Sequence, residues 1–240
     1  MWAGAADLAL DLLCPPRCPL CDSILRMGER TGFVCGSCAG QLPWIREPRC
    51  MRCGRPLSRE EAEYCFPCSR GARPFAAGEC TFLYEKSMRD SVLRMKFQNR
   101  REYLPFYAHA MAERHRAFLE REKPELMIPV PMHPKKRAAR GFDQCLLLAR
   151  QLSELTWIPV EREALRRTRY TAPQKGLSRE QRRRNISGAF LVSRPERIRK
   201  RILLVDDIYT TGATIDECSA ALLEAGARRV CFLALCAGRQ

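Results

Sequence analysis

Short apolar runs alternate with longer amphipathic stretches along the last two thirds of the chain. Four apolar runs of strand length predict β-strands, at residues 80–84, 125–130, 201–206 and 229–236. Stretches with apolar residues at helical spacing predict helices, at residues 87–97, 101–122, 142–155 and 214–225. Because strands that alternate with helices build parallel sheets, the pattern predicts an α/β fold with a parallel sheet flanked by helices.

The beginning of the chain has a different character, rich in Cys, Pro and Gly and poor in periodic pattern. We therefore predict two domains, residues 1–75 and residues 76–240. The stretch 1–14 is mildly apolar, but it lacks a basic leading region and contains Asp7 and Asp11, so we expect a short docking helix rather than an export signal. No apolar run approaches the roughly 20 residues that span a bilayer. These features predict a cytoplasmic protein without membrane insertion.

Eight of the 14 cysteines form four C-x2-C pairs in the first domain, which are Cys18/Cys21, Cys35/Cys38, Cys50/Cys53 and Cys65/Cys68. Each pair can present two thiolates to one metal ion, and two pairs complete a tetrahedral zinc site. The spacing fits two zinc ribbons in series and also an interleaved arrangement, with one or two Zn2+ ions. A disulfide framework is the alternative, and a reducing cytosol disfavours it. We predict structural Zn2+.

The segment ILLVDDIYTTGAT places two adjacent carboxylates, Asp206 and Asp207, at the end of a predicted buried strand. Ligands of parallel sheets bind beyond the carboxyl ends of the strands. A loop of small residues then leads into a predicted helix, and it consists of Thr210, Thr211, Gly212, Ala213 and Thr214. The N–H groups at a helix N-terminus favour a phosphate, whereas the neighbouring carboxylates require ribose hydroxyls or Mg2+ as partners. Together these groups predict a site for a phosphorylated sugar.

The chain carries a net charge of +15, and its placement is one-sided. Residues 130–201 hold 19 Lys and Arg against 6 Asp and Glu, a net charge of +13. A solvated face is the ordinary interpretation, but this concentration favours phosphates, on a small ligand or on nucleic acid. Lys135, Lys136 and Arg137 follow the second strand and offer charge for a diphosphate. Further basic residues are candidates for contact with nucleic acid, namely Lys96, Arg140, Arg179, Arg182, Arg183 and Arg184.

The segment LLVDDIYTTGAT resembles the signature with which type I phosphoribosyltransferases bind phosphoribosyl pyrophosphate (PRPP). The rest of the chain resembles the ComF family, which is associated with DNA uptake and natural transformation in bacteria. The similar segments are the cysteine ribbons, MKF at 95–97, PVPMHPKKRAARGFDQ at 129–144 and TAPQKGLSREQRRRNISGAF at 171–190. One departure is Asp143, which stands where the family pattern R-G-F-N-Q has Asn.

The resemblance implies a fold like that of type I phosphoribosyltransferases, with a small N-terminal zinc module. By that resemblance Asp206 and Asp207 hold the ribose hydroxyls, together with Mg2+. Residues 210–214 then surround the 5-phosphate, and residues 132–137 bind the diphosphate. The implied partners are PRPP, single-stranded DNA and other competence proteins.

Two functions are compatible with these features. The first is a PRPP-binding protein of DNA uptake that binds single-stranded DNA in the cytoplasm. The alternative is a Mg2+-dependent phosphoribosyltransferase that acts on a small-molecule nitrogen acceptor and is unrelated to DNA. Such a transferase would work by electrostatic stabilisation of the leaving diphosphate. The sequence identifies no acceptor.

Overall fold

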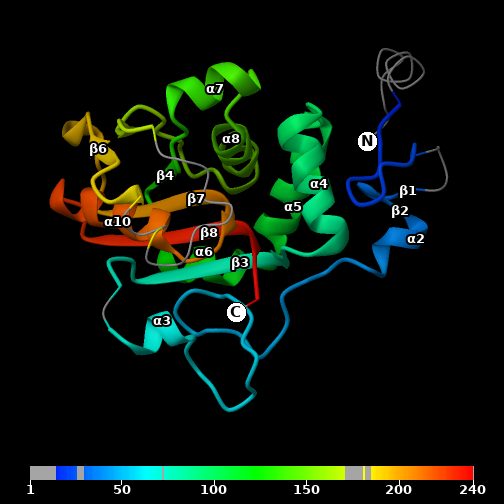
Figure 1. Ribbon diagram of the computed structural model, residues 1–240, viewed down its shortest axis with the longest axis horizontal. Coiled ribbons are helices and arrows are strands. Elements are labelled where there is room, and N and C mark those ends of the chain that lie inside the picture. The colour runs from blue at the N-terminus through cyan, green and yellow to red at the C-terminus, as the bar shows by residue number, and fades with distance from the viewer. Residues whose placement is uncertain (1–14, 26–29, 72, 171–180, 182–184, 240) are drawn as a thin grey trace.

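The computed structural model describes residues 15–25, 30–71, 73–170, 181 and 185–239 (Figure 1). The predicted N-terminal helix lies outside the described residues. So do four of the basic residues that the sequence suggests for nucleic acid, which are Arg179, Arg182, Arg183 and Arg184.

Four strands of the described chain form one parallel sheet. Its order is β3 (Ala77–Leu83), β8 (Arg229–Ala237), β7 (Arg201–Tyr209) and β4 (Leu126–Pro129). Every neighbouring pair is parallel. The predicted α/β fold with a parallel sheet is therefore confirmed.

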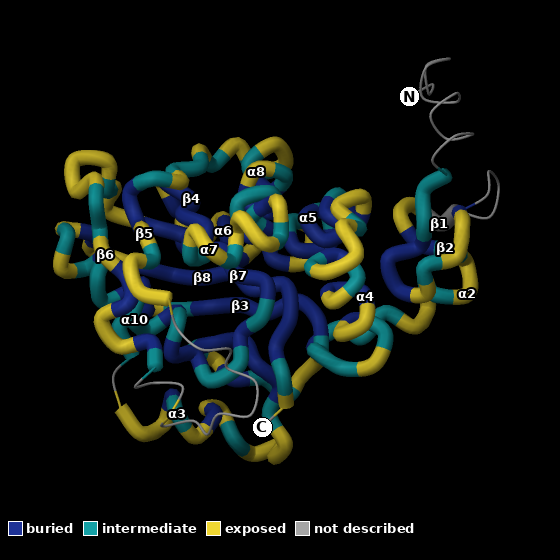
Figure 2. Tube along the Cα trace, turned by 45° about the horizontal axis from the view of Figure 1, so that its top comes forward, coloured by how far each residue is buried: buried dark blue, intermediate teal, exposed yellow. Residues whose placement is uncertain are grey.

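Alternate residues of the central strand β7 face two separate cores. Leu203 and Val205 pack with helices α4 (Lys86–Phe97), α5 (Leu104–Arg114) and α8 (Gln144–Thr156) on one side. Ile202 and Leu204 pack on the other side with helix α10 (Ala213–Glu224) and with the cysteines of the second ribbon. Figure 2 shows these strands as the buried centre of the molecule. Burial on both faces explains why the strand is a continuous apolar run.

Smaller elements surround the carboxyl edge of the sheet. Helix α7 (Pro134–Arg140) follows β4, and a two-stranded antiparallel sheet of β5 (Leu165–Arg167) and β6 (Phe190–Val192) lies beyond α8. A short 3-10 turn, η2 (Pro195–Arg197), connects β6 to β7. Figure 1 shows α7 and α8 above the sheet, with helix α3 (Phe66–Ser69) of the second ribbon below it.

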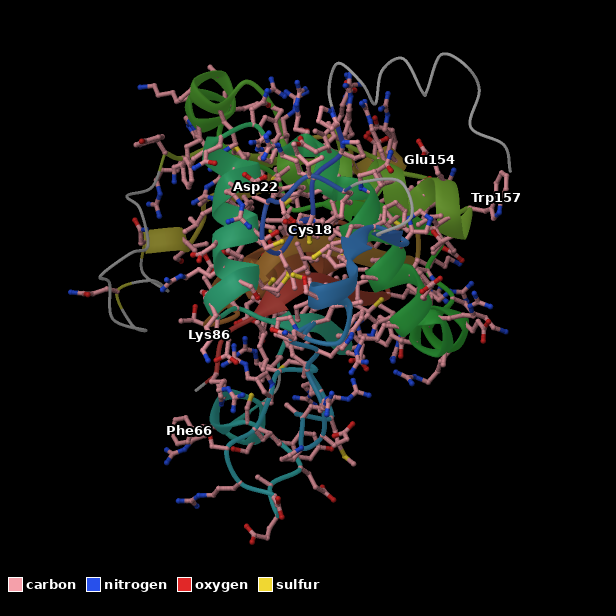
Figure 3. The ribbon with its side chains drawn as sticks, turned by 90° about the vertical axis from the view of Figure 1, so that its right-hand side faces the viewer. Cys18, Asp22, Phe66, Lys86, Glu154 and Trp157 are labelled. Atoms are coloured by element: carbon pink, nitrogen blue, oxygen red, sulfur yellow. The ribbon has the colours of Figure 1, made fainter. Side chains whose placement is uncertain are left out.

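The first ribbon, residues 17–38, contacts the helical side of the molecule. Its secondary structure is β1 (Arg30–Thr31), β2 (Val34–Cys35) and α2 (Gly36–Ala39). The side chain of Arg94 on α4 donates to the carbonyl oxygen of Leu20 at 2.7 Å, and the Tyr103 hydroxyl donates to Asp22. Figure 3 shows Cys18 and Asp22 on this ribbon and Phe66 on the second ribbon, well away from them.

Two sequence-based boundaries are wrong. The helix predicted over 101–122 is divided into η1 (Arg101–Tyr103), α5 and α6 (Arg116–Glu122), because the chain leaves helical geometry at the buried His115. The strand predicted to end at Asp206 runs on to Tyr209, because β8 continues to pair with it up to Ala237. The two carboxylates therefore lie inside the strand. No helix in the described part of the chain is long and apolar enough to cross a membrane.

Gly78 of β3 provides a test of how tightly the side chains of the sheet pack. A Cβ at this position would lie 2.0 Å from the ring of Phe232, which stacks on Tyr209 at 4.7 Å. We expect Gly78→Ala to lower the free energy of unfolding by about 1–3 kcal/mol through overpacking. Gly238→Ala is the matched control, because nothing lies within 4 Å of its Cβ. Chemical denaturation measures both, and equal stability of the two variants would contradict this packing.

Candidate functional site

The acidic pair lies inside β7, two residues before the strand ends at Tyr209, and each aspartate is only 7% exposed. The Asp206 Oδ1 atom accepts a hydrogen bond from the backbone N–H of Asp207 at 2.9 Å. Asp207 forms an ion pair with Lys96 of α4 and accepts from Gln144 Nε2 at 3.2 Å. The Cys145 thiol lies 3.7 Å from Asp206. Helices α4 and α8 thus supply partners for carboxylates that burial would otherwise destabilise.

The two carboxylates differ in protonation. Burial, and then the charge of Asp207, raises the pKa of Asp206 to about 8. Burial also acts to raise the pKa of Asp207, but the charge of Lys96 and its hydrogen bond lower it below the ordinary value. Near neutral pH the pair therefore carries one proton and one negative charge, and Lys96 balances that charge.

The loop after β7 leads directly into α10. Gly212 occupies the left-handed region at φ 84° and stands directly before α10. The Thr211 hydroxyl oxygen accepts from the N–H of Ala213 at 3.4 Å. Asp206 lines the same small hollow as Thr210, Thr211, Gly212, Ala213 and Thr214. The predicted carboxylate and the predicted phosphate loop therefore meet around one space.

The basic turn after β4 reaches the same edge of the sheet. Pro129 is in register with Val205, so the chain leaves β4 next to the acidic pair of β7. The Lys135 and Lys136 ammonium groups lie 5.9 Å and 5.5 Å from the ring centroid of Tyr170. Arg137 lines a neighbouring pocket of about 760 Å3, which includes the turn at 131–134 and residues of β5.

The departure at Asp143 has a structural explanation. Its Oδ1 atom accepts from the backbone N–H of Leu146 at 3.1 Å, so the residue caps helix α8. Asn and Asp are equally good at this position. The cap holds the first turn of α8, which carries Gln144 and Cys145 to the acidic pair.

A rim of the acidic site combines an aromatic ring and an arginine. Arg140 donates to the Gln144 side-chain oxygen at 2.6 Å, and its guanidinium lies 5.3 Å from the ring of Phe97. Phe97 is 71% exposed, whereas the neighbouring Lys96 side chain is 13% exposed and pairs with Asp207. Lys96 therefore lies inside the site, and its contact with nucleic acid stays a prediction, as does that of Arg140. The sequence analysis selected Lys96 and not Phe97 as a candidate residue, although the segment MKF pairs an aromatic residue with a lysine, as base-stacking surfaces often do.

The eight paired cysteines form two clusters in series. Cys18, Cys21, Cys35 and Cys38 make the first cluster, and Cys50, Cys53, Cys65 and Cys68 make the second. Within each cluster the sulfur atoms lie within 4.8 Å of one another. Tetrahedral Zn–S bonds place ligand sulfurs about 3.8 Å apart, and the Cys21–Cys35 and Cys53–Cys65 pairs lie at 3.8 Å and 3.6 Å. The donor set and its spacing fit structural Zn2+ in each ribbon.

Comparisons with known proteins agree with both halves of this structure. A double zinc ribbon domain model matches residues 9–69, and a phosphoribosyl transferase domain model matches residues 142–240. Competence protein F of Haemophilus influenzae is 30% identical over 220 residues, which cover 89% of this chain and 93% of the relative. DNA utilization protein YhgH of Escherichia coli (strain K12) is 28% identical over 228 residues, which cover 94% of this chain and 98% of the relative. Competence protein ComFC of Streptococcus pneumoniae is 26% identical over 211 residues, with 87% and 89% covered.

Among solved structures, the chain is similar to the hypoxanthine phosphoribosyl transferase of Trypanosoma cruzi. The match covers 57% of this chain and 66% of that one, with 15% identity and a TM-score of 0.36. This likeness is too low for a comparison of the two sites.

The raised pKa of Asp206 predicts a pH-dependent stability. The folded chain holds the Asp206 proton up to a pKa of about 8, against an ordinary value of 3.8. The resulting stabilisation is complete below about pH 4 and is lost as the pH rises through about 8. We expect Asp206→Asn, whose amide oxygen can still accept from Asp207, to be more stable than the parent at about pH 8.5. The difference should shrink towards about pH 5.

Thermal unfolding of both proteins across this pH range measures the effect. Asp90→Asn is the control, because Asp90 lies on the exposed face of α4, beside Arg89. A stability difference for Asp206→Asn that did not change with pH would contradict the protonation of Asp206.

Proposed function

Because the chain belongs to the competence protein F (ComF) family, we propose that it serves DNA uptake as a cytoplasmic protein that binds PRPP and single-stranded DNA. The observation that carries the proposal is that Asp206 of the acidic pair lines one hollow with the loop at the start of α10. The names of the relatives, which refer to competence and to DNA utilization, support the role in DNA uptake. Reduced four-cysteine sites suit the cytoplasm.

The ribose and its phosphate suit the two sides of the hollow. An ionised Asp207 accepts hydrogen bonds from sugar hydroxyls, and a protonated Asp206 both donates and accepts. The 5-phosphate would lie at the start of α10, where backbone N–H groups and the helix dipole favour an anion. A ligand of this kind would compete with Lys96 for Asp207 and leave the ammonium free to approach the ligand's own anionic groups.

The diphosphate of PRPP would lie towards the basic turn after β4, near Lys135, Lys136 and Arg137. Mg2+ enters with this ligand as its counterion. The acidic pair itself suits hydroxyls better than a resident Mg2+, because Lys96 already pairs with Asp207 and the nearby Cys145 thiol is a soft donor.

A small-molecule phosphoribosyltransferase is the second candidate, and the pocket of about 760 Å3 beside Arg137 supports it. Pockets of this size hold small organic ligands. In such a reaction an acceptor nitrogen would bond to the ribose C1 atom and lose a proton, while pyrophosphate leaves with the electrons of the broken C–O bond.

Single-stranded DNA would bind at the rim of Phe97 and Arg140. An exposed ring accepts a stacked base, and the adjacent guanidinium adds a charge for the phosphate backbone. The ring lies 5.3 Å from Arg140, which connects through Gln144 to Asp207. A base stacked there would adjoin the proposed sugar site.

Removal of both carboxylates should abolish PRPP binding. We expect Asp206→Asn with Asp207→Asn to weaken PRPP affinity by at least about a hundredfold, since several hydrogen bonds to a charged group are lost. Calorimetry with PRPP and Mg2+ measures the affinity, and circular dichroism checks the fold. Asp90→Asn is the control on the neighbouring helix. Retained affinity in the double variant would exclude the acidic pair as the ribose site.

Removal of the exposed ring should weaken binding of single-stranded DNA. We expect Phe97→Ala to lower affinity by about fivefold or more, because stacking of one base contributes about 1–3 kcal/mol. Trp157→Ala is a matched control, because this ring is 89% exposed but lies past the far end of α8 from Gln144. Fluorescence anisotropy with a labelled oligonucleotide at fixed salt measures both. Equal losses in the two variants would contradict a specific rim.

The basic cluster outside the described residues has its own diagnostic. Replacement of Arg182, Arg183 and Arg184 by Gln should reduce the log–log salt slope by up to about 2, at about 0.7 per lost phosphate contact. Phe97→Ala should leave that slope unchanged, which separates stacking from charge. An unchanged salt slope in the triple variant would indicate that these arginines form a solvated surface and do not contact DNA.

A further inference from the structure

We propose that the second zinc ribbon, residues 50–68, together with the segment that follows it, is part of the phosphate site. Arg55 of the ribbon and Arg73 after it hold the loop between β7 and α10, so that zinc at this ribbon and a phosphate ligand at the loop bind cooperatively. The inference rests on the proposed function, in which that loop binds the 5-phosphate.

Arg55 connects the ribbon to the loop directly. It is 1% exposed and is among the largest fully buried side chains of the described chain. Its Nη2 group donates to the carbonyl oxygen of Thr210, and its guanidinium lies 4.8 Å from the ring of Tyr209. A charged group is buried at such a place only when its surroundings compensate its lost hydration. The contact therefore fixes both the end of β7 and the first residue of the loop.

This contact orients the peptide that would face the ligand. In a trans peptide the C=O and N–H groups point in opposite directions. Because the Thr210 carbonyl oxygen is directed at Arg55, the N–H of Thr211 is directed away from the ribbon. The ribbon thus sets the direction of a donor that an anion at the loop would use.

Arg73 acts on the start of helix α10. Its Nη2 atom lies 2.8 Å from Asp216 Oδ2, and Asp216 stands in the first turn of α10. An unbalanced carboxylate there would repel a phosphate at the same helix end. The same Nη2 atom would lie 2.2 Å from a Cβ at Gly212, so the guanidinium is packed directly against the loop backbone. Arg73 both balances Asp216 and confines the loop.

The zinc knuckle determines where Arg55 lies. The backbone N–H of Cys50 donates to the carbonyl oxygen of Arg55 at 2.8 Å. The backbone N–H of Gly54 donates to the carbonyl oxygen of Cys50 at 2.9 Å. Gly54 lies at φ 64°, and a Cβ there would approach the Glu79 Cα atom of β3 to 2.7 Å. The turn at residues 50–55 therefore packs closely against β3. When bound, Zn2+ would close the four cysteines of the second ribbon around this turn.

The first ribbon provides an internal contrast. It contacts α4 and Tyr103 through Leu20 and Asp22, and none of the hydrogen bonds or ion pairs described for it reaches residues 210–216. Both ribbons have the same four-cysteine chemistry. Coupling to a phosphate ligand should therefore be confined to the second ribbon.

The first experiment measures the affinities of ribose 5-phosphate and PRPP by calorimetry, using the zinc-loaded full chain. Ribose 5-phosphate lacks the diphosphate and so reports on the loop. We expect Arg55→Met to weaken both ligands by about tenfold or more, a typical size for coupling between sites. Arg70→Met is the matched control, because Arg70 follows the same ribbon and lies 4.6 Å from the ring centroid of Phe66, away from the loop. Its affinities should equal those of the parent.

The second experiment measures the reciprocal effect, zinc release to a chelator with and without PRPP. Linkage requires PRPP to protect the zinc of the second ribbon to the extent that zinc strengthens PRPP binding. The parent should show this protection, and Arg55→Met should lose it. Cys18→Ser with Cys21→Ser, which removes the first site, should leave the protection intact. A purely structural arginine would not move this readout.

The third experiment keeps the test sharp if Arg55→Met is poorly folded. Arg73→Met should weaken ribose 5-phosphate by exposing the ligand to the Asp216 charge, and Arg73→Met with Asp216→Asn should recover most of the loss. A double-mutant cycle isolates this coupling.

Failure of the parent to bind PRPP would refute the proposed function. Tight binding by the parent with unchanged affinity and zinc protection in Arg55→Met, or no recovery in the Arg73 cycle, would overturn this inference alone.

Discussion

The ion pair between Lys96 and Asp207 is the interaction on which the site depends. Two adjacent carboxylates inside a buried strand would repel each other and lose their hydration. Lys96 balances one of them, and protonation of Asp206 removes the charge of the other. A single lysine on α4 thereby allows β7 to keep two adjacent aspartates within the core of the sheet.

The two ribbons contact the two elements next to the acidic pair, helix α4 and the loop after β7. The first ribbon contacts α4 at Arg94, two residues before Lys96, which pairs with Asp207. The second ribbon reaches the loop after β7 through Arg55. Small metal-bound modules are rigid without a large hydrophobic core. In this protein each ribbon also contacts an element next to the acidic pair.

Local pattern predicted the sheet but not what joins its parts. All four strands of the parallel sheet were predicted, because buried parallel strands are continuous apolar runs. The end of β7 was misplaced by three residues, because pairing with β8 overrides the polarity of Asp206 and Asp207. The candidate loop was visible from its small residues alone.

The sequence pattern could not predict which distant residues contact the acidic pair and the loop after it. Lys96 and Arg55 lie more than a hundred residues from the groups they contact, so only tertiary packing brings them together. The spacing of the cysteines left two pairings open, and the fold decides for ribbons in series. Asp143, which departs from the expected Asn, proved to be an ordinary helix cap.

The same network places the proposed sugar and DNA sites in contact. Phe97 follows Lys96 on α4, and Arg140 touches both the Phe97 ring and Gln144, which donates to Asp207. A sugar that replaces Lys96 as the partner of Asp207 would change the contacts at the end of α4, where Phe97 lies. Any such effect must be reciprocal, so DNA at the ring would change the affinity for the sugar by the same factor. Coupling between the two ligands would therefore follow from these shared residues if both bind where we propose.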